Sequence, residues 1–235
     1  DIYDSASSDF SNGLLTKILR KLDLFAISKS DFLILADKKR QDQINIDNTN
    51  YKSLFDVENV PNYNDKAIPI NSLDFNKIRL SYVGVFDPMR GLEELMNFVD
   101  KNENYILNIA GSGTLIDLVK VKSMNQERIR YHGSVKYEKG IDIMRQSDFI
   151  IGMYHKKASN HIYAAPNKFF EALYLAKPLI TTKGTLVGDK TESFKTGYAI
   201  DETENDLETF FNNFQKNKNN SIKEYELIIR NTANL

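Results

Sequence analysis

Residues 164–182 read AAPNKFFEALYLAKPLITT, a helical pattern that runs directly into a short apolar strand. Proline suits the first turn of a helix, because its missing amide hydrogen would be unpaired there anyway and its φ angle is already helical. The helix is therefore predicted to begin near Pro166. The strand that follows, residues 177–182, is apolar on both faces, which is typical of a strand inside a parallel sheet.

The polar residues at the front of this helix indicate an anion site. The first backbone amides of a helix are unpaired and lie at the positive end of its dipole, so they attract phosphate, and Lys168 adds a mobile charge. Asn167 and Glu171 share a face, where a carboxylate accepts hydrogen bonds from two neighbouring hydroxyls such as those of ribose. A plainer interpretation stays open at this point: Glu171 only complements the dipole, and Lys168 is a solvated surface charge.

Four more apolar runs precede this unit, and amphipathic segments separate them. The runs are RLSYVGV (79–85), YILNIAG (105–111), IRYHG (129–133) and DFIIGMY (148–154). Their alternation with helical patterns predicts βαβ units, and right-handed crossovers turn these into an α/β fold. We predict a Rossmann-like parallel sheet with helices on both faces, and ligands of such sheets bind beyond the carboxyl ends of the strands.

The sequence divides into four predicted segments. Residues 1–62 contain the apolar strand FLILA (32–36) between helical patterns, and such a strand needs more neighbours than this segment supplies. We interpret 1–62 as the terminal part of an N-terminal α/β domain, whose remainder lies upstream or is supplied by another chain. Residues 63–77 have the composition of an interdomain linker, 78–202 form the Rossmann-like domain, and 203–235 form C-terminal helices.

Composition excludes several classes of function. The 235 residues carry 31 lysines and arginines against 32 acidic residues, so no global field attracts nucleic acid. There is no cysteine, which excludes disulfides, thiolate catalysis and cysteine-ligated metals, and three scattered histidines make a weak case for zinc. Neither a membrane span of about 20 residues nor a signal peptide is recognised. We expect a cytoplasmic protein.

Two further loops place candidate binding groups at the same sheet edge. Gly84 ends the first strand of the sheet, and Arg90 follows at the start of a helix, within reach of an anion. Gly111 and Gly113 follow the second strand and permit close approach of the backbone to a ligand. Taken singly, an exposed arginine and a tight turn explain them equally well.

The loop after the third strand is a candidate for contact with a flat ring. Gly133 ends that strand and leaves backbone groups of Ser134 and Val135 free. His132 alone is more often a structural residue than a catalyst. The conjunction of all these loops at one edge favours a diphosphate linked to a nucleoside.

The order of these motifs resembles that of glycosyltransferases of the GT-B fold, especially the retaining enzymes of glycosyltransferase family 4. YVG with RGL is followed by LNIAGSGTL, then by YHGSV with MRQSDFIIGMY, and then by PNKFFEALYLAKPLITT. The similarity covers roughly residues 55–200 and includes ENVPNYND (58–65), which is similar to the interdomain linker of the family.

The resemblance implies roles for individual residues. Arg90 takes the place of the diphosphate-binding lysine of the family, Lys168 and the amides near Asn167 meet the same diphosphate, and Glu171 matches the glutamate that binds the ribose hydroxyls. Arg90 and Lys168 are thereby the candidate catalytic residues, because cations at the leaving diphosphate lower the barrier to transfer. The remaining donor-binding positions implied are Gly84, Gly111, Gly113, Gly133, Ser134 and Val135.

Two positions depart from the family pattern. Val85 stands where many members carry a diphosphate-binding arginine, which removes one cation. Tyr163 stands eight positions before Glu171, where many members have a second glutamate near the donor sugar. The contacts to the sugar are therefore left to the loop 152–165.

The function implied is transfer of a hexose, with retention, from a UDP- or GDP-linked sugar to a glycan or lipid-linked acceptor in bacterial surface polysaccharide synthesis, such as capsule or exopolysaccharide. Such an enzyme needs no metal or other cofactor, and its N-terminal domain can associate peripherally with the inner face of the membrane. The alternative is a donor-binding subunit, or a non-catalytic nucleotide-sugar-binding module, that needs a partner chain for the acceptor site; transfer by this chain alone is left open. A nicotinamide-dependent dehydrogenase is disfavoured, because VGVFDPMRG lacks the required glycine spacing.

Overall fold

A computed structural model describes residues 14–44, 53–58, 60 and 73–233 of the chain. Its largest part is a six-stranded sheet in which all neighbouring strands are parallel. The strand order is β5-β4-β3-β6-β7-β8. The strands are β3 (Ile78–Phe86), β4 (Tyr105–Gly113), β5 (Ile129–Tyr131), β6 (Phe149–Gly152), β7 (Leu179–Thr182) and β8 (Gly197–Ile200). This confirms the predicted Rossmann-like sheet, and the order reverses between β3 and β6, where such folds place their ligands.

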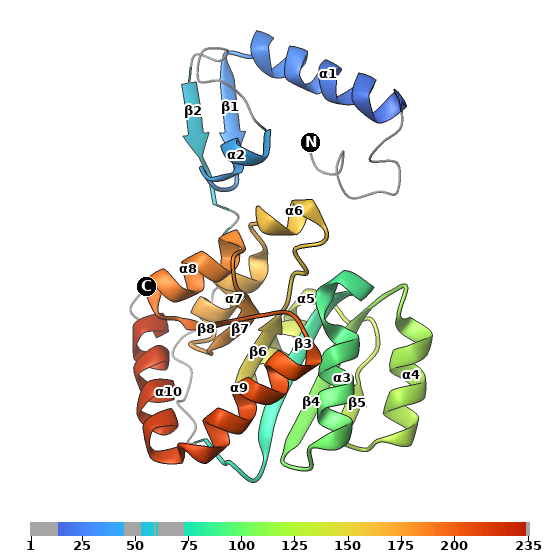
Figure 1. The fold of residues 1–235 in the computed structure, drawn as a ribbon, viewed down its shortest axis with the longest axis vertical. Coiled ribbons are helices and arrows are strands. Elements are labelled where there is room, and N and C mark those ends of the chain that lie inside the picture. The colour runs from blue at the N-terminus through green and yellow to red at the C-terminus, as the bar shows by residue number, and fades with distance from the viewer. Residues whose placement is uncertain (1–13, 45–52, 59, 61–72, 234–235) are drawn as a thin grey trace.

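Helices cover both faces of this sheet (Figure 1). One core cluster joins it to α3 (Leu92–Lys101), α4 (Ile116–Asn125), α9 (Glu204–Lys216) and α10 (Lys218–Ala233). A second cluster joins it to α5 (Tyr137–Arg145), α7 (Asn167–Tyr174) and α8 (Leu186–Phe194). Two short pieces, η1 (Pro88–Arg90) and α6 (Ser159–Ile162), lie in loops at the carboxyl ends of the strands.

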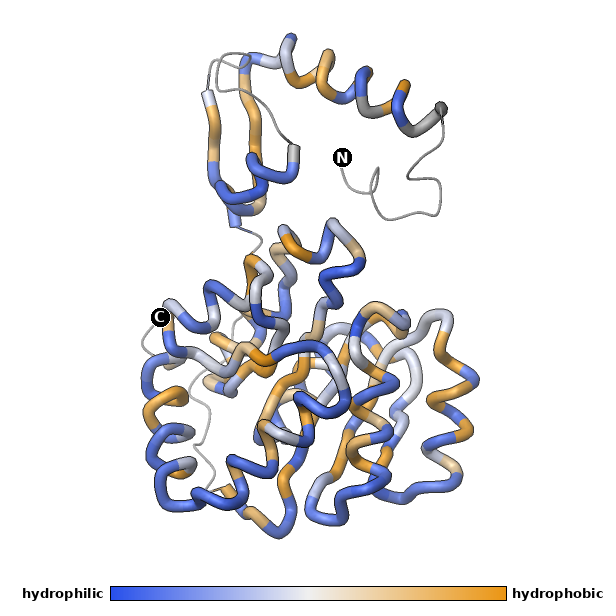
Figure 2. Tube along the Cα trace, in the orientation of Figure 1, coloured by the Kyte–Doolittle hydropathy of each residue, from blue (hydrophilic) through white to orange (hydrophobic). Residues whose placement is uncertain are grey.

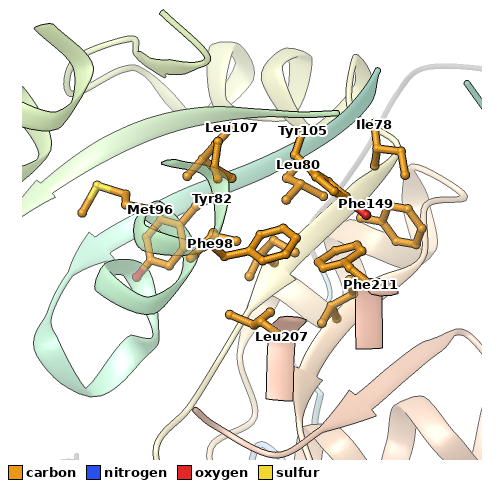
Figure 3. Packing of buried hydrophobic residues seen from close by; sticks show 14 of the residues in the cluster. Ile78, Leu80, Tyr82, Met96, Phe98, Tyr105, Leu107, Phe149, Leu207 and Phe211 are labelled. Atoms are coloured by element: carbon orange, nitrogen blue, oxygen red, sulfur yellow. The ribbon is translucent and has the colours of Figure 1, made fainter. Parts of the chain in front are cut away.

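Aromatic rings fill the larger cluster. Phe98 of α3 and Phe211 of α9 stack with their centroids 4.9 Å apart, and Tyr105 of β4 meets Phe211 edge to face at the same distance (Figure 3). Aromatic side chains bury large apolar areas and favour these offset and edge-to-face arrangements. This packing fixes α3 and α9 against the sheet.

The amino ends of the strands are joined by a buried ion pair. Asp148, at the start of β6, is fully buried and accepts hydrogen bonds from the backbone and the guanidinium of Arg79 on β3, with Arg79 Nη2 at 2.8 Å from Oδ1. The hydroxyl of Tyr225 on α10 donates to the carbonyl of Asp148 at 3.1 Å. The end of the sheet opposite the predicted site is therefore fixed by a satisfied polar network.

Two strands were not predicted from the sequence. β8 is four residues long, contains a glycine, and is only half-buried at the sheet edge, so it lacks the apolar pattern of the inner strands. β2 (Ser53–Asp56) pairs in parallel with β1 (Phe32–Leu35) in a separate two-stranded sheet. It is similarly short and exposed.

The N-terminal segment has a very small core. α1 (Leu14–Lys29) places Ile27 against Leu33 and Leu35 of β1, and α2 (Arg40–Ile44) follows. The other face of β1 is exposed, with Phe32 at 62% and Ile34 at 65% of their full accessibility, and Figure 2 shows the hydrophobic strands of this segment. The incomplete second α/β segment is thus present as expected.

Ion pairs join this segment to α8. Lys190 of α8 pairs with Asp37, just after β1, at 2.6 Å, and also pairs with Glu58. Lys39 pairs with Asp189 at 3.1 Å. The predicted linker 63–77 falls largely outside the described residues, so the proposed domain boundaries stay predictions.

Candidate functional site

A cavity of about 510 Å³ lies at the carboxyl ends of β3, β4 and β6. Its volume is within the range of roughly 300–1,000 Å³ that small-molecule sites occupy. The cavity is walled by the strand ends, by the start of α5 and by the start of α7. It therefore occupies the switch point of the sheet, where the sequence placed its candidate binding groups.

Seven of the ten predicted site residues line this cavity. They are Gly84, Arg90, Gly111, Val135, Asn167, Lys168 and Glu171. Gly113, Gly133 and Ser134 are not among the residues that line it. The roles assigned to all ten stay predictions, but the structure brings the seven together from four separate parts of the chain.

Helix α7 begins one residue later than expected. Pro166 has an extended conformation, with φ −78° and ψ 148°, and is the cap residue before the first helical residue, Asn167. The expected place of this proline inside the first turn is therefore wrong by one position. The backbone amides of the first helical turn still lie at the cavity, because Pro166, Asn167 and Lys168 all line it.

Lys168 and Glu171 form an ion pair within the cavity. Lys168 Nζ lies 2.6 Å from Glu171 Oε2, and the two side chains are only 12% and 7% exposed. The same ammonium contacts the sulfur of Met144 at 3.4 Å. The interpretation of Lys168 as a solvated surface charge is therefore wrong, and the two residues predicted to bind different parts of one ligand are paired with each other.

Arg90 also lines the cavity. It ends the short helix η1 and is partly exposed, with its guanidinium carbon 5.3 Å from the centre of the Tyr154 ring. Burial raises the pKa of Tyr154 to about 12, and the charge of Arg90 opposes this rise. The hydroxyl of Tyr154 therefore stays protonated at neutral pH.

Two of the predicted glycines are required by the sheet itself. A Cβ atom on Gly111 would lie 1.8 Å from the carbonyl oxygen of Gly84, and one on Gly113 would lie 2.4 Å from that of Phe86. Both glycines sit within β4, paired with β3, rather than after the strand as expected. Glycine is needed at both positions because β3 and β4 approach each other closely there. Gly111 also lines the cavity.

The loop proposed to meet a flat ring contributes only part of its length to the cavity. Val135 lines it together with Lys136 and Tyr137, whereas His132 bonds through Nε2 to Asn108 Oδ1 at 3.0 Å. Burial lowers the pKa of His132, and nearby Lys139 and Arg130 lower it further. This fits the structural interpretation of His132.

Sequence reasoning missed three tyrosines that line the cavity, Tyr137 at the start of α5 and two that belong to apolar runs. Tyr82 is buried in β3, with its hydroxyl donating to the carbonyl of Val85 at 2.7 Å, and Tyr154 follows β6. Both lie inside apolar runs, where an aromatic residue is the ordinary choice for a core strand. Tyr154 alone stands at the carboxyl end of its run, and only that position carried a signal.

The described part of the chain has neither a metal-binding cluster nor a membrane-spanning helix. Within it, no three histidine, cysteine, aspartate or glutamate side chains are grouped so that they could hold a metal ion. No helix in the described ranges has the length and apolar character needed to cross a membrane.

The sequence matches no family model and no curated protein, but the fold matches solved structures. Sucrose-phosphate synthase from Thermosynechococcus elongatus is 14% identical, with a TM-score of 0.71 over 97% of this chain and 59% of the other. TarM from S. aureus, solved with UDP, is 15% identical, with a TM-score of 0.63 over 97% and 45%. WaaG, a glycosyltransferase involved in lipopolysaccharide biosynthesis, is 14% identical, with a TM-score of 0.60 over 86% and 58%.

These matches define the class of fold. The chain has the GT-B glycosyltransferase fold that its motifs resemble, and the site lies in the Rossmann-like part of that fold. It spans 45 to 59% of the lengths of these three proteins.

Proposed function

We propose that this chain is the donor-binding half of a glycosyltransferase that uses a nucleotide sugar. The observation that carries the proposal is the cavity at the switch point, which both Arg90 and Lys168 line and where Glu171 is paired with Lys168. Two cations and a buried carboxylate are what a diphosphate and a ribose diol require. The solved GT-B structures with UDP support this ligand class.

The same groups suit the chemistry of transfer. When the bond between the anomeric carbon and the diphosphate breaks, the electron pair stays on the phosphate oxygen and negative charge grows there. The Arg90 guanidinium, the Lys168 ammonium and the first amides of α7 can stabilise that charge. Fixed charges of this kind bind the transition state more strongly than the substrate, which is the condition for catalysis.

The finer features of the function are proposals on the family resemblance. We infer a UDP- or GDP-linked hexose as donor, transfer with retention and without a metal, and a glycan or lipid-linked acceptor of a bacterial surface polysaccharide. A cytoplasmic location, with peripheral contact to the membrane through the acceptor-side domain, accompanies that role.

Calorimetry of nucleotide binding tests the proposal. The chain is titrated, without metal, with UDP, GDP, ADP and CMP and with the matching nucleosides. We expect one nucleoside diphosphate to bind, and Glu171→Ala to weaken it by about 1 to 3 kcal/mol, the usual range for lost charge-assisted hydrogen bonds. Lys168→Ala should weaken the binding of the diphosphate far more than the binding of the nucleoside.

Exposed residues of the same types provide matched controls. Lys120→Ala and Glu192→Ala remove an exposed lysine and an exposed glutamate that do not line the cavity, and both should leave the affinity unchanged. Absence of binding by every diphosphate to a folded wild-type chain contradicts the proposal. If Lys168→Ala lowers the affinity for the diphosphate and for the nucleoside equally, Lys168 does not bind the phosphates.

A second candidate is a donor-binding subunit whose acceptor site comes from another polypeptide. The observation that favours it is the exposed apolar face of the small sheet, where Phe32, Ile34 and Phe55 are 62%, 65% and 48% exposed. Such a face is covered in a stable protein. Transfer of sugar by the purified chain alone would argue against this candidate, whereas donor binding without transfer would support it.

A further inference from the structure

Tyr154 is held rigidly at the wall of the cavity. Its backbone amide donates to Thr182 Oγ1 of β7 at 2.8 Å, and its ring meets His161 of α6 edge to face at 5.7 Å. The side chain is only 4% exposed and packs among the apolar residues beneath α5 and α7. The face of the ring is therefore a fixed surface next to the space for a ligand.

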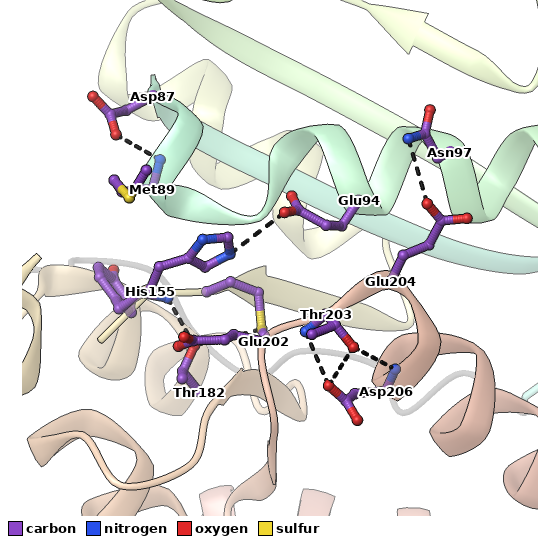
Figure 4. Close-up of polar contacts among 12 residues, drawn as sticks. Asp87, Met89, Glu94, Asn97, His155, Thr182, Glu202, Thr203, Glu204 and Asp206 are labelled. Carbon is purple, nitrogen blue, oxygen red and sulfur yellow. Dashed lines mark hydrogen bonds and ion pairs between the residues drawn. The ribbon is translucent and has the colours of Figure 1, made fainter. Parts of the chain in front are cut away.

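The turn that carries Arg90 is tied to the same stretch of chain. Asp87 caps this turn, accepting a hydrogen bond from the amide of Met89 at 2.8 Å, as Figure 4 shows. The amide of His155, directly after Tyr154, donates to the carbonyl of Met89 at 2.9 Å. These bonds set the distance between the backbone of Arg90 and that of Tyr154.

The side chain of His155 lies between the two loops. Its Nε2 lies 3.8 Å from Glu94 Oε1 of α3, the helix that follows Arg90, and Figure 4 shows the ring directed at that carboxylate. Gly91 lies beneath this ring, since a Cβ there would be 3.6 Å from His155 Nε2. The loops of β3 and β6 are thus joined immediately beside the Arg90–Tyr154 contact.

The contact between the two side chains has the geometry of a cation–π interaction. The guanidinium carbon of Arg90 lies 5.3 Å from the ring centroid of Tyr154, inside the limit of about 6 Å for an energetically useful pair. Such a contact is stronger where the ring is desolvated, as it is here. Arg90 has four rotatable side-chain bonds, so a surface that restricts it reduces the entropy lost when it binds an anion.

We infer that Tyr154 is a positioning residue for the diphosphate of the donor: its ring holds the Arg90 guanidinium at the cavity wall, ready to meet the phosphate oxygens. This role rests on the proposed function of the site. A purely structural core residue in this place would need only volume, which leucine or phenylalanine also supplies. What tyrosine and phenylalanine share, and leucine lacks, is the π face that Arg90 contacts.

Two substitutions at this position separate the ring from the volume. Tyr154→Phe keeps the ring and removes the hydroxyl, and Tyr154→Leu removes the ring. With UDP or GDP as the probe, Tyr154→Leu should lower the affinity on the order of tenfold, and Tyr154→Phe should restore most of it. The affinity for uridine or guanosine should stay within about twofold in both variants, because the nucleoside does not contact Arg90.

A double-mutant cycle with Arg90→Gln shows whether Tyr154 acts through Arg90. We expect Tyr154→Leu to have no further effect on UDP or GDP binding once Arg90 is replaced, because the group that it positions is gone. Urea unfolding of each variant establishes that it is folded, and Tyr154→Phe provides the test if Tyr154→Leu does not fold.

Different binding results would overturn the positioning role of Tyr154 or the proposed function of the site. If the fold-losses of UDP or GDP affinity from the two single variants multiply in the double variant, Tyr154 does not act through Arg90. Equal losses of affinity for the diphosphate and for the nucleoside have the same meaning. Both results overturn the positioning role and leave the proposed donor site intact. A Tyr154→Phe variant as weak as Arg90→Gln also overturns it, because the ring is then not the active part. A folded wild-type chain that binds none of the nucleoside diphosphates UDP, GDP and ADP overturns the proposed function itself, together with this inference.

Discussion

At the scale of single residues, the site contains charges that satisfy one another. Lys168 and Glu171 are nearly buried and are paired at 2.6 Å. Burying either charge alone would be costly, so the pair is also a structural requirement of the start of α7. A ligand with a ribose and a diphosphate replaces part of this pairing with its own groups, whereas a free anion competes with Glu171 for Lys168.

This competition gives the first prediction. Glu171→Gln keeps the size of the side chain but removes its charge, so Lys168 is released for anions. We expect the affinity for inorganic pyrophosphate to rise by roughly fivefold, about 1 kcal/mol, while the affinity for UDP or GDP falls. Calorimetry measures both, with Glu138→Gln at an exposed position of α5 as the control. Weaker binding of pyrophosphate would show that Glu171 does not restrain Lys168.

His161 gives a prediction for acid stability. Burial lowers its pKa in the folded chain, and the charge of Arg90 lowers it further. Below the ordinary value of about 6.5 the unfolded chain binds more protons than the folded chain, so stability decreases as the pH falls toward the folded pKa. His161→Gln should make the free energy of unfolding less dependent on pH below about pH 6.5. Urea unfolding at several pH values measures this, and parallel curves for wild type and variant would contradict it.

The sequence predicted Lys168 and Glu171 as site residues but not Tyr154, for physical reasons. A proline followed by a lysine and a glutamate marks a helix start with unpaired amides, so Lys168 and Glu171 were found. Their mutual ion pair was not, because side-chain conformation depends on the buried surroundings of both. Tyr154 was hidden for the opposite reason: its surroundings are apolar, and a tyrosine in an apolar run indicates a core strand.

At the scale of elements, the strands with apolar runs were predicted, including the edge strand β5, and the edge strand β8 was not. β3, β4, β6 and β7 are apolar on both faces because helices cover both, and this pattern is readable without a structure. β8 has one neighbour and is half-buried along its length. Its formation depends on the strand beside it more than on its own residues.

The close approach of β3 and β4 gives a prediction for this scale. Gly111→Ala places a methyl group against the carbonyl oxygen of Gly84, whereas Gly84→Ala meets no atom within 4 Å. Both glycines have positive φ angles, 138° and 154°, so the pair isolates the clash from the conformational cost. We expect Gly111→Ala to be less stable than Gly84→Ala by at least about 2 kcal/mol in urea unfolding. Equal stability would show that the strands can separate at low cost.

At the scale of the whole molecule, the N-terminal segment is joined to the Rossmann-like domain by charge. Burial lowers the pKa of Lys190, but hydrogen bonds and charges from Asp37 and Glu58 outweigh this and leave it raised. Asp37 is 6% exposed, so it depends on Lys190 for compensation of its charge.

Removing this lysine should detach the segment without harming the donor site. We expect Lys190→Met to cost about 1 to 3 kcal/mol of the docking free energy and to increase proteolysis in the N-terminal segment, because Asp37 is left buried without its cation. The affinity for UDP or GDP should change by less than about twofold, since Lys190 does not line the cavity. Lys183→Met on the same domain is the control, and unchanged proteolysis of Lys190→Met would contradict the prediction.

Lys190 also touches α7, the helix that bears the proposed donor-binding residues. Its ammonium lies over the rings of Phe169 and Phe170 of α7, 5.9 and 5.7 Å from their centres, while it pairs with Asp37 of the other segment. The side chain of Lys190 thus contacts both the N-terminal segment and α7 of the Rossmann-like domain. A chimera that combines this proposed donor half with a foreign N-terminal half therefore needs an acidic residue at the place of Asp37, or a neutral replacement at Lys190, so that no unpaired ammonium is left between the halves.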